Sequence, residues 1–125
     1  MNVDIVNTKA YYNSIMETSL CDCSYCRNYR LKVKVMFPKV SKYLDSFGID
    51  IEKPFETSPL EPDENGMLEY CCCQYIAFGS CNNEYQYRIG NVEFRIATSY
   101  PSTGIEREHF VIEFYPIKLK FDKGA

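Results

Sequence analysis

Residues 85–96 read Tyr-Gln-Tyr-Arg-Ile-Gly-Asn-Val-Glu-Phe-Arg-Ile, and this stretch decides the fold. Apolar and polar side chains alternate on both sides of the central Gly-Asn pair, which is the pattern of two β-strands joined by a two-residue hairpin loop. A loop of this length sets each apolar side chain opposite another. The expected pairs are Ile89 with Val92, Tyr87 with Phe94, and Tyr85 with Ile96. Since Arg88 also meets Glu93 on the other face, the sequence predicts an antiparallel hairpin with one apolar face.

Two further segments, one before and one after the hairpin, share this alternation. We therefore expect strands at about residues 68–79, 84–89, 92–98 and 109–121, arranged as an antiparallel meander of about four strands. In the first strand Leu68, Tyr70 and Cys72 are expected on one face, and Cys71, Cys73 and Tyr75 on the other. In the last strand the apolar residues change parity beyond Pro116. This change indicates a bulge or bend, and a strand that lies at a sheet edge or changes direction.

Before these strands the apolar residues recur with the period of an α-helix. The first apolar stripe consists of Cys26, Tyr29, Val33 and Met36. It predicts a helix at about residues 23–36. A second helix is expected at about residues 38–47, because Pro38 suits a first helical turn and Gly48 suits a left-handed C-terminal cap.

The rest of the chain adds no second domain. Residues 1–20 fit either a short strand or a helical turn, and the proline-rich residues 49–66 read as a loop. With 125 residues, of which 46% are hydrophobic, the chain is long enough to bury a core without staples. We therefore expect a single domain, residues 1–125, of the α+β class, in which an N-terminal helical region packs on the antiparallel meander.

Charge and hydropathy exclude some classes of partner. No stretch approaches 18 consecutive apolar residues, so a membrane-spanning helix is excluded. The net charge of −3 argues against a protein that binds the nucleic-acid backbone. Six basic residues and no acidic one lie between Arg27 and Lys42, but an acidic segment follows at residues 50–64. For this stretch a solvated helix face is therefore favoured over a basic binding face. The sequence leaves open whether the protein binds a protein partner.

The cysteines are clumped, which is untypical of a disulfide scaffold. They are Cys21, Cys23, Cys26, Cys71, Cys72, Cys73 and Cys81. An odd number leaves one unpaired, and neighbouring cysteines on a strand point to opposite faces, so they cannot bridge each other without distortion. The first residues lack the basic region and apolar core of a secretory signal. We therefore expect free thiols in a cytoplasmic protein.

Three of these thiols lie within six residues at the predicted start of the first helix. The helix dipole and the unpaired N–H groups there favour thiolates, which is the form that zinc binds. A tetrahedral site needs a fourth ligand, which the second cysteine group can supply if the helices cover its strand face. The candidate ligands of a zinc site are therefore Cys21, Cys23, Cys26 and Cys73. The other donors are Cys71, Cys81 and His109. The alternative is that these are buried thiols that pack as small apolar residues.

Cys23-Ser-Tyr-Cys26 also has the spacing of thiol–disulfide exchange motifs. The apolar strand and βαβ unit that accompany such motifs are missing, so a thiol-dependent redox protein or enzyme using Cys23 or Cys26 is the second interpretation. His109 is the only histidine, and we find no phosphate-binding glycine loop, metalloprotease helix or serine-hydrolase elbow. The favoured function is a non-catalytic binding or interaction module with a structural zinc or a thiol cluster.

Several motifs together resemble an uncharacterised family of small bacterial proteins. They begin with Cys-x-Cys-x-x-Cys-Arg-Asn-Tyr at residues 21–29 and Gly-Ile-Asp-Ile-Glu-Lys-Pro-Phe-Glu at residues 48–56. The similarity continues through Gln-Tyr-Ile-Ala-Phe-Gly at residues 74–79 and Pro-Ser-Thr-Gly-Ile at residues 101–105, so it covers most of the chain. The resemblance implies a bacterial cytoplasmic protein, but it brings no function and no catalytic residues.

Overall fold

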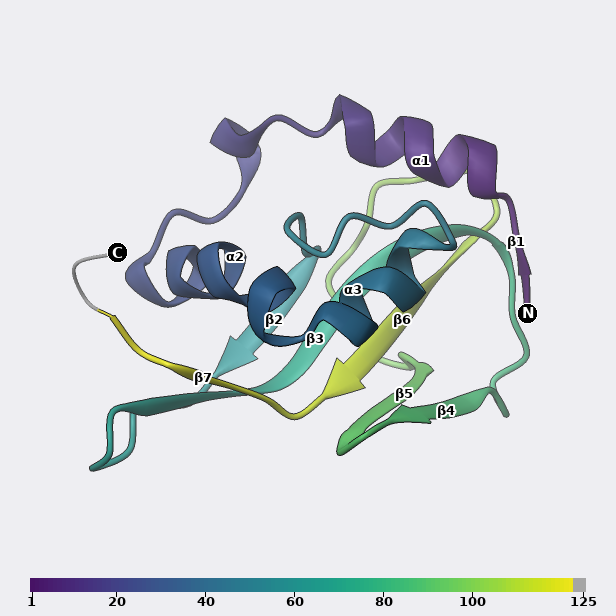
Figure 1. Ribbon diagram of the computed structural model, residues 1–125. Helices are drawn as coiled ribbons and strands as arrows, with labels where there is room; N and C mark the ends of the chain where they lie inside the picture. The colour runs from purple at the N-terminus through teal and green to yellow at the C-terminus, as the bar shows by residue number, and fades with distance from the viewer. Residues whose placement is uncertain (123–125) are drawn as a thin grey trace.

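The computed structural model describes residues 1–122, and within them the predicted α+β class is confirmed: three α-helices cover an antiparallel sheet (Figure 1). The helices are α1 (Ile5–Ser14), α2 (Ser24–Met36) and α3 (Pro38–Asp45). The strands are β1 (Asn2–Val3), β2 (Glu56–Pro59), β3 (Met67–Ser80), β4 (Gln86–Ile89), β5 (Val92–Ile96), β6 (His109–Tyr115) and β7 (Ile117–Lys120). In this part of the chain no helix has the length and apolar character to cross a membrane.

Helices α2 and α3 lie where the apolar periodicity predicts them, with ends shifted by one or two residues. Cys23 is the N-cap of α2, and Pro38 opens α3 in its first turn. Gly48 follows α3 with φ of 83°, the left-handed conformation that the sequence predicts there. The predicted stripe of α2 is wrong at its last member: Met36 is 62% exposed, because the helix ends there and the chain turns into α3.

Residues 1–20 contain both a short strand and a helix, and α1 is attached to the sheet by buried hydrogen bonds. The Thr8 Oγ1 atom accepts the backbone N–H of Phe78 at 3.0 Å. The Tyr12 hydroxyl donates to the carbonyl oxygen of Ile76 at 2.7 Å. Because polar groups make these contacts, the segment carries little apolar periodicity, which is why its sequence pattern does not identify a helix.

The strand order differs from a simple meander. Neighbouring strands follow the order β1-β3-β6-β5-β4, with β2 and β7 also paired to β3. The long strand β3 therefore lies beside β6 rather than beside β4. Strand β6 is buried throughout residues 110–114, whereas β4 is largely exposed. A strand that is buried on both faces belongs inside a sheet, and an exposed strand is tolerated at the edge.

The predicted hairpin is present with the predicted register. Strands β4 and β5 pair Ile89 with Val92, Tyr87 with Phe94, and Arg88 with Glu93. Arg88 and Glu93 also form an ion pair on the exposed face of the hairpin. The expected Tyr85–Ile96 pair is not part of the ladder, which ends at Gln86 and Arg95. Tyr85 instead shares a hydrogen bond with the hydroxyl of Tyr43 on α3.

The change of phase at Pro116 occurs as predicted: within residues 1–122, β7, beyond the proline, pairs with β3 alone and lies at a sheet edge, whereas β6 pairs with both β3 and β5 and lies inside the sheet. Strands β6 and β7, on either side of Pro116, both pair with β3. Strand β3 changes phase at the same level, across Cys71 and Cys72, so the strict alternation predicted for it is wrong. Its core-facing residues are Leu68, Tyr70, Cys73, Tyr75 and Ala77. The two slips match because paired strands must present their apolar residues to the same core.

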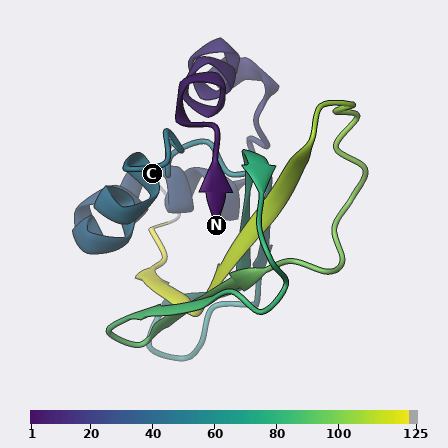
Figure 2. The same cartoon turned by 90° about the vertical axis from the view of Figure 1, so that its right-hand side faces the viewer.

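The main core lies between the sheet and helices α2 and α3, and the loop between β5 and β6 lies on the opposite side of the sheet (Figure 2). The largest fully buried side chains of the main core include Tyr29, Leu44, Tyr70, Tyr75, Phe94 and Phe114. A smaller cluster on the other face contains Ile76, Ala97 and Val111, with Ile105 of that loop packed against it. The helices are thus fixed by aromatic and aliphatic packing, which positions the start of α2 for the site described next.

Candidate metal centre

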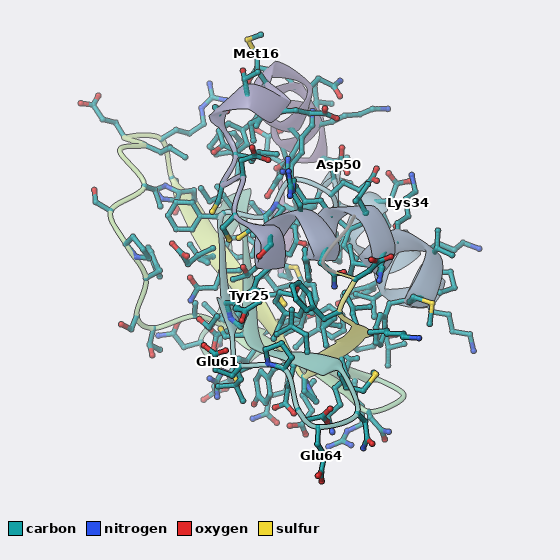
Figure 3. The ribbon with its side chains drawn as sticks, turned by 90° about the vertical axis from the view of Figure 1, so that its left-hand side faces the viewer. Met16, Tyr25, Lys34, Asp50, Glu61 and Glu64 are labelled. Atoms are coloured by element: carbon teal, nitrogen blue, oxygen red, sulfur yellow. The ribbon has the colours of Figure 1, made fainter. Side chains whose placement is uncertain are left out.

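The structure brings together three of the four predicted metal ligands. The sulfur atoms of Cys21, Cys23 and Cys26 all lie within 4.8 Å of one another. Cys21 and Cys23 are exposed and Cys26 is half-buried, so this thiol cluster faces solvent at the start of α2. Figure 3 views the molecule from this side, where Tyr25 in the first turn of α2 points toward Glu61 and donates its hydroxyl to Oε2 at 3.1 Å.

The start of α2 produces this convergence. Cys23 is the N-cap, and its Sγ atom accepts the backbone N–H of Cys26 at 3.4 Å. The first helical turn then returns the Cys26 side chain to the same end of the helix. Cys21 is fixed from further along α2, because Arg30 Nη2 donates to its carbonyl oxygen at 3.2 Å. Helix capping and one arginine therefore set the positions of the three thiols, of which Cys21 and Cys23 are exposed.

The hydrogen bonds at the helix start act oppositely on Cys23 and Cys26. Partial burial opposes ionisation of Cys23, but the backbone N–H groups of Cys26 and Tyr25 and the thiols of Cys26 and Cys21 donate to its sulfur and lower its pKa. For Cys26, burial and the hydrogen bonds with the sulfurs of Cys23 and Cys21 raise the pKa to about 12. Without an ion, Cys23 therefore ionises before Cys26, and the thiols of Cys21 and Cys26 donate hydrogen bonds to its sulfur.

The spacing of the sulfurs suits a thiophilic ion. Two thiolates bound at about 2.3 Å to a tetrahedral ion lie about 3.8 Å apart. The sulfur atoms lie at most 4.8 Å apart, so they need to approach one another by at most about 1 Å. Small rotations of the cysteine side chains are sufficient for this. Three thiolates around a divalent cation leave one negative charge. Arg30, whose Nη2 atom lies 3.8 Å from Asp22 and donates to the carbonyl oxygen of Cys21, places a positive charge next to the Cys21 backbone.

Cys73, the fourth predicted ligand, is not part of the thiol cluster. It faces the helices, but it is fully buried in the core, beneath Tyr29 of α2. Burial raises the pKa of its thiol, and a hydrogen bond with the Tyr29 hydroxyl opposes this rise. Tyr29 lies almost one helical turn beyond Cys26, so Cys73 packs under the body of α2 and not at its start.

The remaining sulfur and imidazole donors also lie outside the cluster. They are bonded elsewhere: Cys71 to Glu69 at 3.8 Å, Cys72 to Glu113 at 3.3 Å, Cys81 to Asn82 at 3.5 Å, and His109 to Thr103 at 2.8 Å. Among the residues that the structure describes, the metal-ligating group of His, Cys, Asp and Glu side chains thus has three members.

Thr57 is a neighbour of the cluster that the sequence does not identify. Its Oγ1 atom lies 3.7 Å from Cys26 Sγ, and its hydrogen bond favours the ionised form of that thiol. Thr57 belongs to β2, which pairs with β3 through Thr57 and Cys73. The sequence predicts a loop here because prolines surround this four-residue strand, which is too short to show an alternating pattern.

A second polar group lies on the opposite face of the sheet, and the sequence does not identify it either. Glu113 of β6 is 5% exposed, and its carboxylate accepts hydrogen bonds from Arg95 Nε, from Gln74 Nε2 at 2.9 Å and from Cys72 Sγ at 3.3 Å. Burial opposes ionisation of Glu113, but these hydrogen bonds and the Arg95 charge outweigh it and lower its pKa. All three donors belong to neighbouring strands, so we interpret this group as a structural ion pair.

Part of the basic stretch between Arg27 and Lys42 is used within the molecule. Arg27 and Arg30 lie beside Asp22, and Lys32 Nζ donates to the carbonyl oxygen of Lys120 at 2.8 Å. These contacts favour the interpretation of the stretch as a solvated helix face that also supports the end of β7.

Comparison with known proteins gives no match to this chain among protein-family models, curated proteins or solved structures. The thiol cluster is therefore the feature from which a function is proposed.

Proposed function

We propose that this protein is a small α+β metal-binding module in which Cys21, Cys23 and Cys26 hold a thiophilic ion, with zinc(II) as the favoured ion. The observation that carries this proposal is the convergence of the three sulfurs to within 4.8 Å. Packing does not account for it, because Cys21 and Cys23 are exposed and gain nothing as small apolar residues.

The donor set favours soft metal ions. Thiolates select zinc(II), copper(I) and iron–sulfur clusters, whereas calcium and magnesium require oxygen ligands. Zinc(II) has no geometric preference from its d-electrons and accepts three thiolates together with one further ligand. The N-cap of α2 adds N–H donors to the sulfurs, and such outer hydrogen bonds are typical supports of metal ligands.

Metal titration tests this proposal. The reduced protein is freed of metal and titrated with zinc(II) and with cobalt(II), whose absorption reports thiolate ligands. We expect one ion per chain, and a loss of affinity of at least about tenfold in each of Cys21→Ser, Cys23→Ser and Cys26→Ser. Cys71→Ser is the matched control, since Cys71 lies outside the cluster, and it should bind as the wild type does. Less than about 0.1 ion per chain at saturating metal would refute the proposal.

A second candidate function is thiol–disulfide exchange by Cys23 and Cys26, favoured by the position of Cys23 at a helix N-terminus. The Cys23 thiolate would attack a substrate disulfide and release one substrate thiolate. The Cys26 thiolate would then attack the mixed disulfide and release the second, so the substrate disulfide is reduced to two thiols as Cys23 and Cys26 are oxidised. The Cys26 proton passes to a departing thiolate.

Trapping of the mixed disulfide distinguishes the two functions. In the double variant Cys21→Ser/Cys26→Ser no other thiol of the cluster can resolve the intermediate, so an exchange protein should accumulate Cys23 joined to glutathione when it is mixed with oxidised glutathione, detected by mass spectrometry. The wild type should instead form the internal disulfide. If neither adduct forms within hours while metal binds stoichiometrically, the metal-binding function stands and the exchange function fails.

A further inference from the structure

The thiol cluster offers three protein ligands and leaves the place of a fourth open. Among residues 1–122, no further His, Cys, Asp or Glu ligand atom joins the group whose members lie within 4.8 Å of one another. Structural zinc sites are closed by four protein ligands, whereas sites with three protein ligands keep one position for an exchangeable group. Because Cys21 and Cys23 are exposed, this position is accessible from solvent.

The cluster also lies outside the core, so the fold does not depend on an ion there. None of its three cysteines belongs to the hydrophobic core or to the side chains packed against it. Helix α2 is fixed instead by the buried residues Tyr29 and Val33 and by Asn28. The Asn28 amide donates to the carbonyl oxygen of Lys120 at 3.1 Å and accepts the N–H of Asp122 at 3.0 Å.

We propose that the thiol cluster is a metal-exchange site: an acceptor molecule that carries thiols enters the open fourth position and takes the ion from Cys21, Cys23 and Cys26. This inference rests on the proposed metal-binding function. An open position accessible from solvent and a core that does not need the ion are the two features that a site for transfer requires and a structural site lacks.

The transfer step is a ligand exchange without oxidation or reduction. A thiolate of the acceptor donates an electron pair to the ion and forms the fourth metal–sulfur bond. As further acceptor thiolates bind, the bonds to the three cysteines break one at a time. Each released cysteine takes up a proton that an acceptor thiol has lost, so zinc(II) keeps its charge and the protons balance.

Thr57 provides a way to close the site. Its Oγ1 atom lies 3.7 Å from Cys26 Sγ, which is close to the spacing of about 3.8 Å between two thiolates on one tetrahedral ion. The β2–β3 ladder fixes its backbone. Thr57→Cys therefore places a fourth thiol next to Cys26, and Thr57→Val is the matched control, which keeps the side-chain shape and supplies no ligand.

Cobalt(II) spectra and transfer rates test the inference. We expect the cobalt(II) wild type to gain thiolate absorption when 2-mercaptoethanol is added, because the small thiol enters the fourth position. Thr57→Cys should show the four-thiolate spectrum without added thiol. Transfer of zinc(II) to excess dithiothreitol should be at least about tenfold slower from Thr57→Cys than from the wild type and Thr57→Val, since a fourth protein ligand must also be released.

The outcomes separate this inference from the proposed function. If the wild type binds no cobalt(II) or zinc(II), the metal-binding function itself fails. If the wild type binds but its spectrum does not respond to the added thiol, or if it releases zinc(II) as slowly as Thr57→Cys, the exchange site is refuted and metal binding stands. Should Thr57→Cys not fold, the response of the wild-type spectrum decides alone.

Discussion

At the scale of single residues, Glu113 illustrates how the sheet tolerates a buried charge on the face that lies away from the helices. Its side chain is 6% exposed, whereas its partner Arg95 is 54% exposed. The hydrogen bonds from Arg95, Gln74 and Cys72 replace the water that the carboxylate loses on folding. Replacing the carboxylate by an amide therefore removes the charge and turns one of its two acceptor oxygens into an NH2 group that faces these donors.

We predict that Glu113→Gln lowers stability in a pH-dependent way. The pKa of Glu113 is lower in the folded protein than its ordinary value. Its contribution is therefore fully present above about pH 4.3 and is lost as the pH falls through the folded value. At pH 7 the variant should be less stable by roughly 1–3 kcal/mol, and the difference should shrink below about pH 4. Urea unfolding at pH 7, 5 and 3.5 measures both effects.

Glu93→Gln is the control for this experiment. Glu93 pairs with Arg88 on the exposed face of the hairpin, and both side chains are in contact with solvent. Its variant should differ from the wild type by less than about 1 kcal/mol at every pH. A stability difference for Glu113→Gln that stays constant from pH 7 to 3.5 would contradict the assigned linkage.

The residues of the candidate site divide into those that local sequence predicts and those that it cannot. Cys23 and Cys26 converge through a single capped helical turn, and Cys21 is two residues from the N-cap, so their close spacing in the sequence indicates the cluster. The absence of Cys73 from it depends on which turn of α2 lies above β3, since Cys73 faces the helices but packs beneath Tyr29. Thr57 depends on a strand pairing between distant segments. Such contacts are fixed only by the assembled fold.

At the scale of elements, α1 depends on two buried hydrogen bonds to β3. We predict that Thr8→Val, which keeps the shape of the side chain, costs about 1–3 kcal/mol, because the N–H of Phe78 loses its acceptor inside the protein. Thr8→Ser keeps the hydroxyl and should cost less. Hydrogen exchange at the Phe78 amide is the direct measurement: it should accelerate in Thr8→Val and stay slow in Thr8→Ser. Equal exchange rates in both variants would refute this attachment.

The pairing of β1 with β3 depends on a glycine of β3. Gly79 has φ of 115°, and a Cβ atom there would lie 2.1 Å from the carbonyl oxygen of Asn2. We predict that Gly79→Ala separates β1 from the sheet and costs roughly 2 kcal/mol or more, since the new atom meets backbone that cannot move aside alone. Gly104→Ala is the control, because φ is also positive there but nothing lies within 4 Å. Thermal unfolding compares them, and an equal loss in both would show that the contact with Asn2 is unimportant.

The elements that the sequence predicts are those with a local cause. Helices α2 and α3 have apolar stripes, and the β4–β5 hairpin has a two-residue loop that fixes its own register. The position of β3 beside β6 has no local signal, because it depends on which strand gains most from burial on both faces.

At the scale of the whole molecule, the core and the thiol cluster are separate. The core is closed by helices α2 and α3 over the sheet, and its buried residues are distributed from Tyr12 to Leu119. The cluster lies at one end of α2, beside β2, where its exposed thiols contribute no apolar contact. This arrangement differs from small zinc-dependent domains, which are unfolded without their metal.

We therefore predict that chelation removes the ion and leaves the protein folded. Circular dichroism should be unchanged after treatment with EDTA, and the amides of β3 and β6 should stay protected from exchange, because the core does not contain the ligands. The free energy of unfolding should fall only by the binding contribution, about 2.7 kcal/mol when free zinc(II) is at 100 times its dissociation constant, and the melting temperature should fall accordingly. In Cys26→Ser the melting temperature should no longer respond to zinc(II). Cooperative unfolding on chelation would instead identify a structural zinc site, and it would also argue against exchange, since a protein that transfers its ion must survive without it.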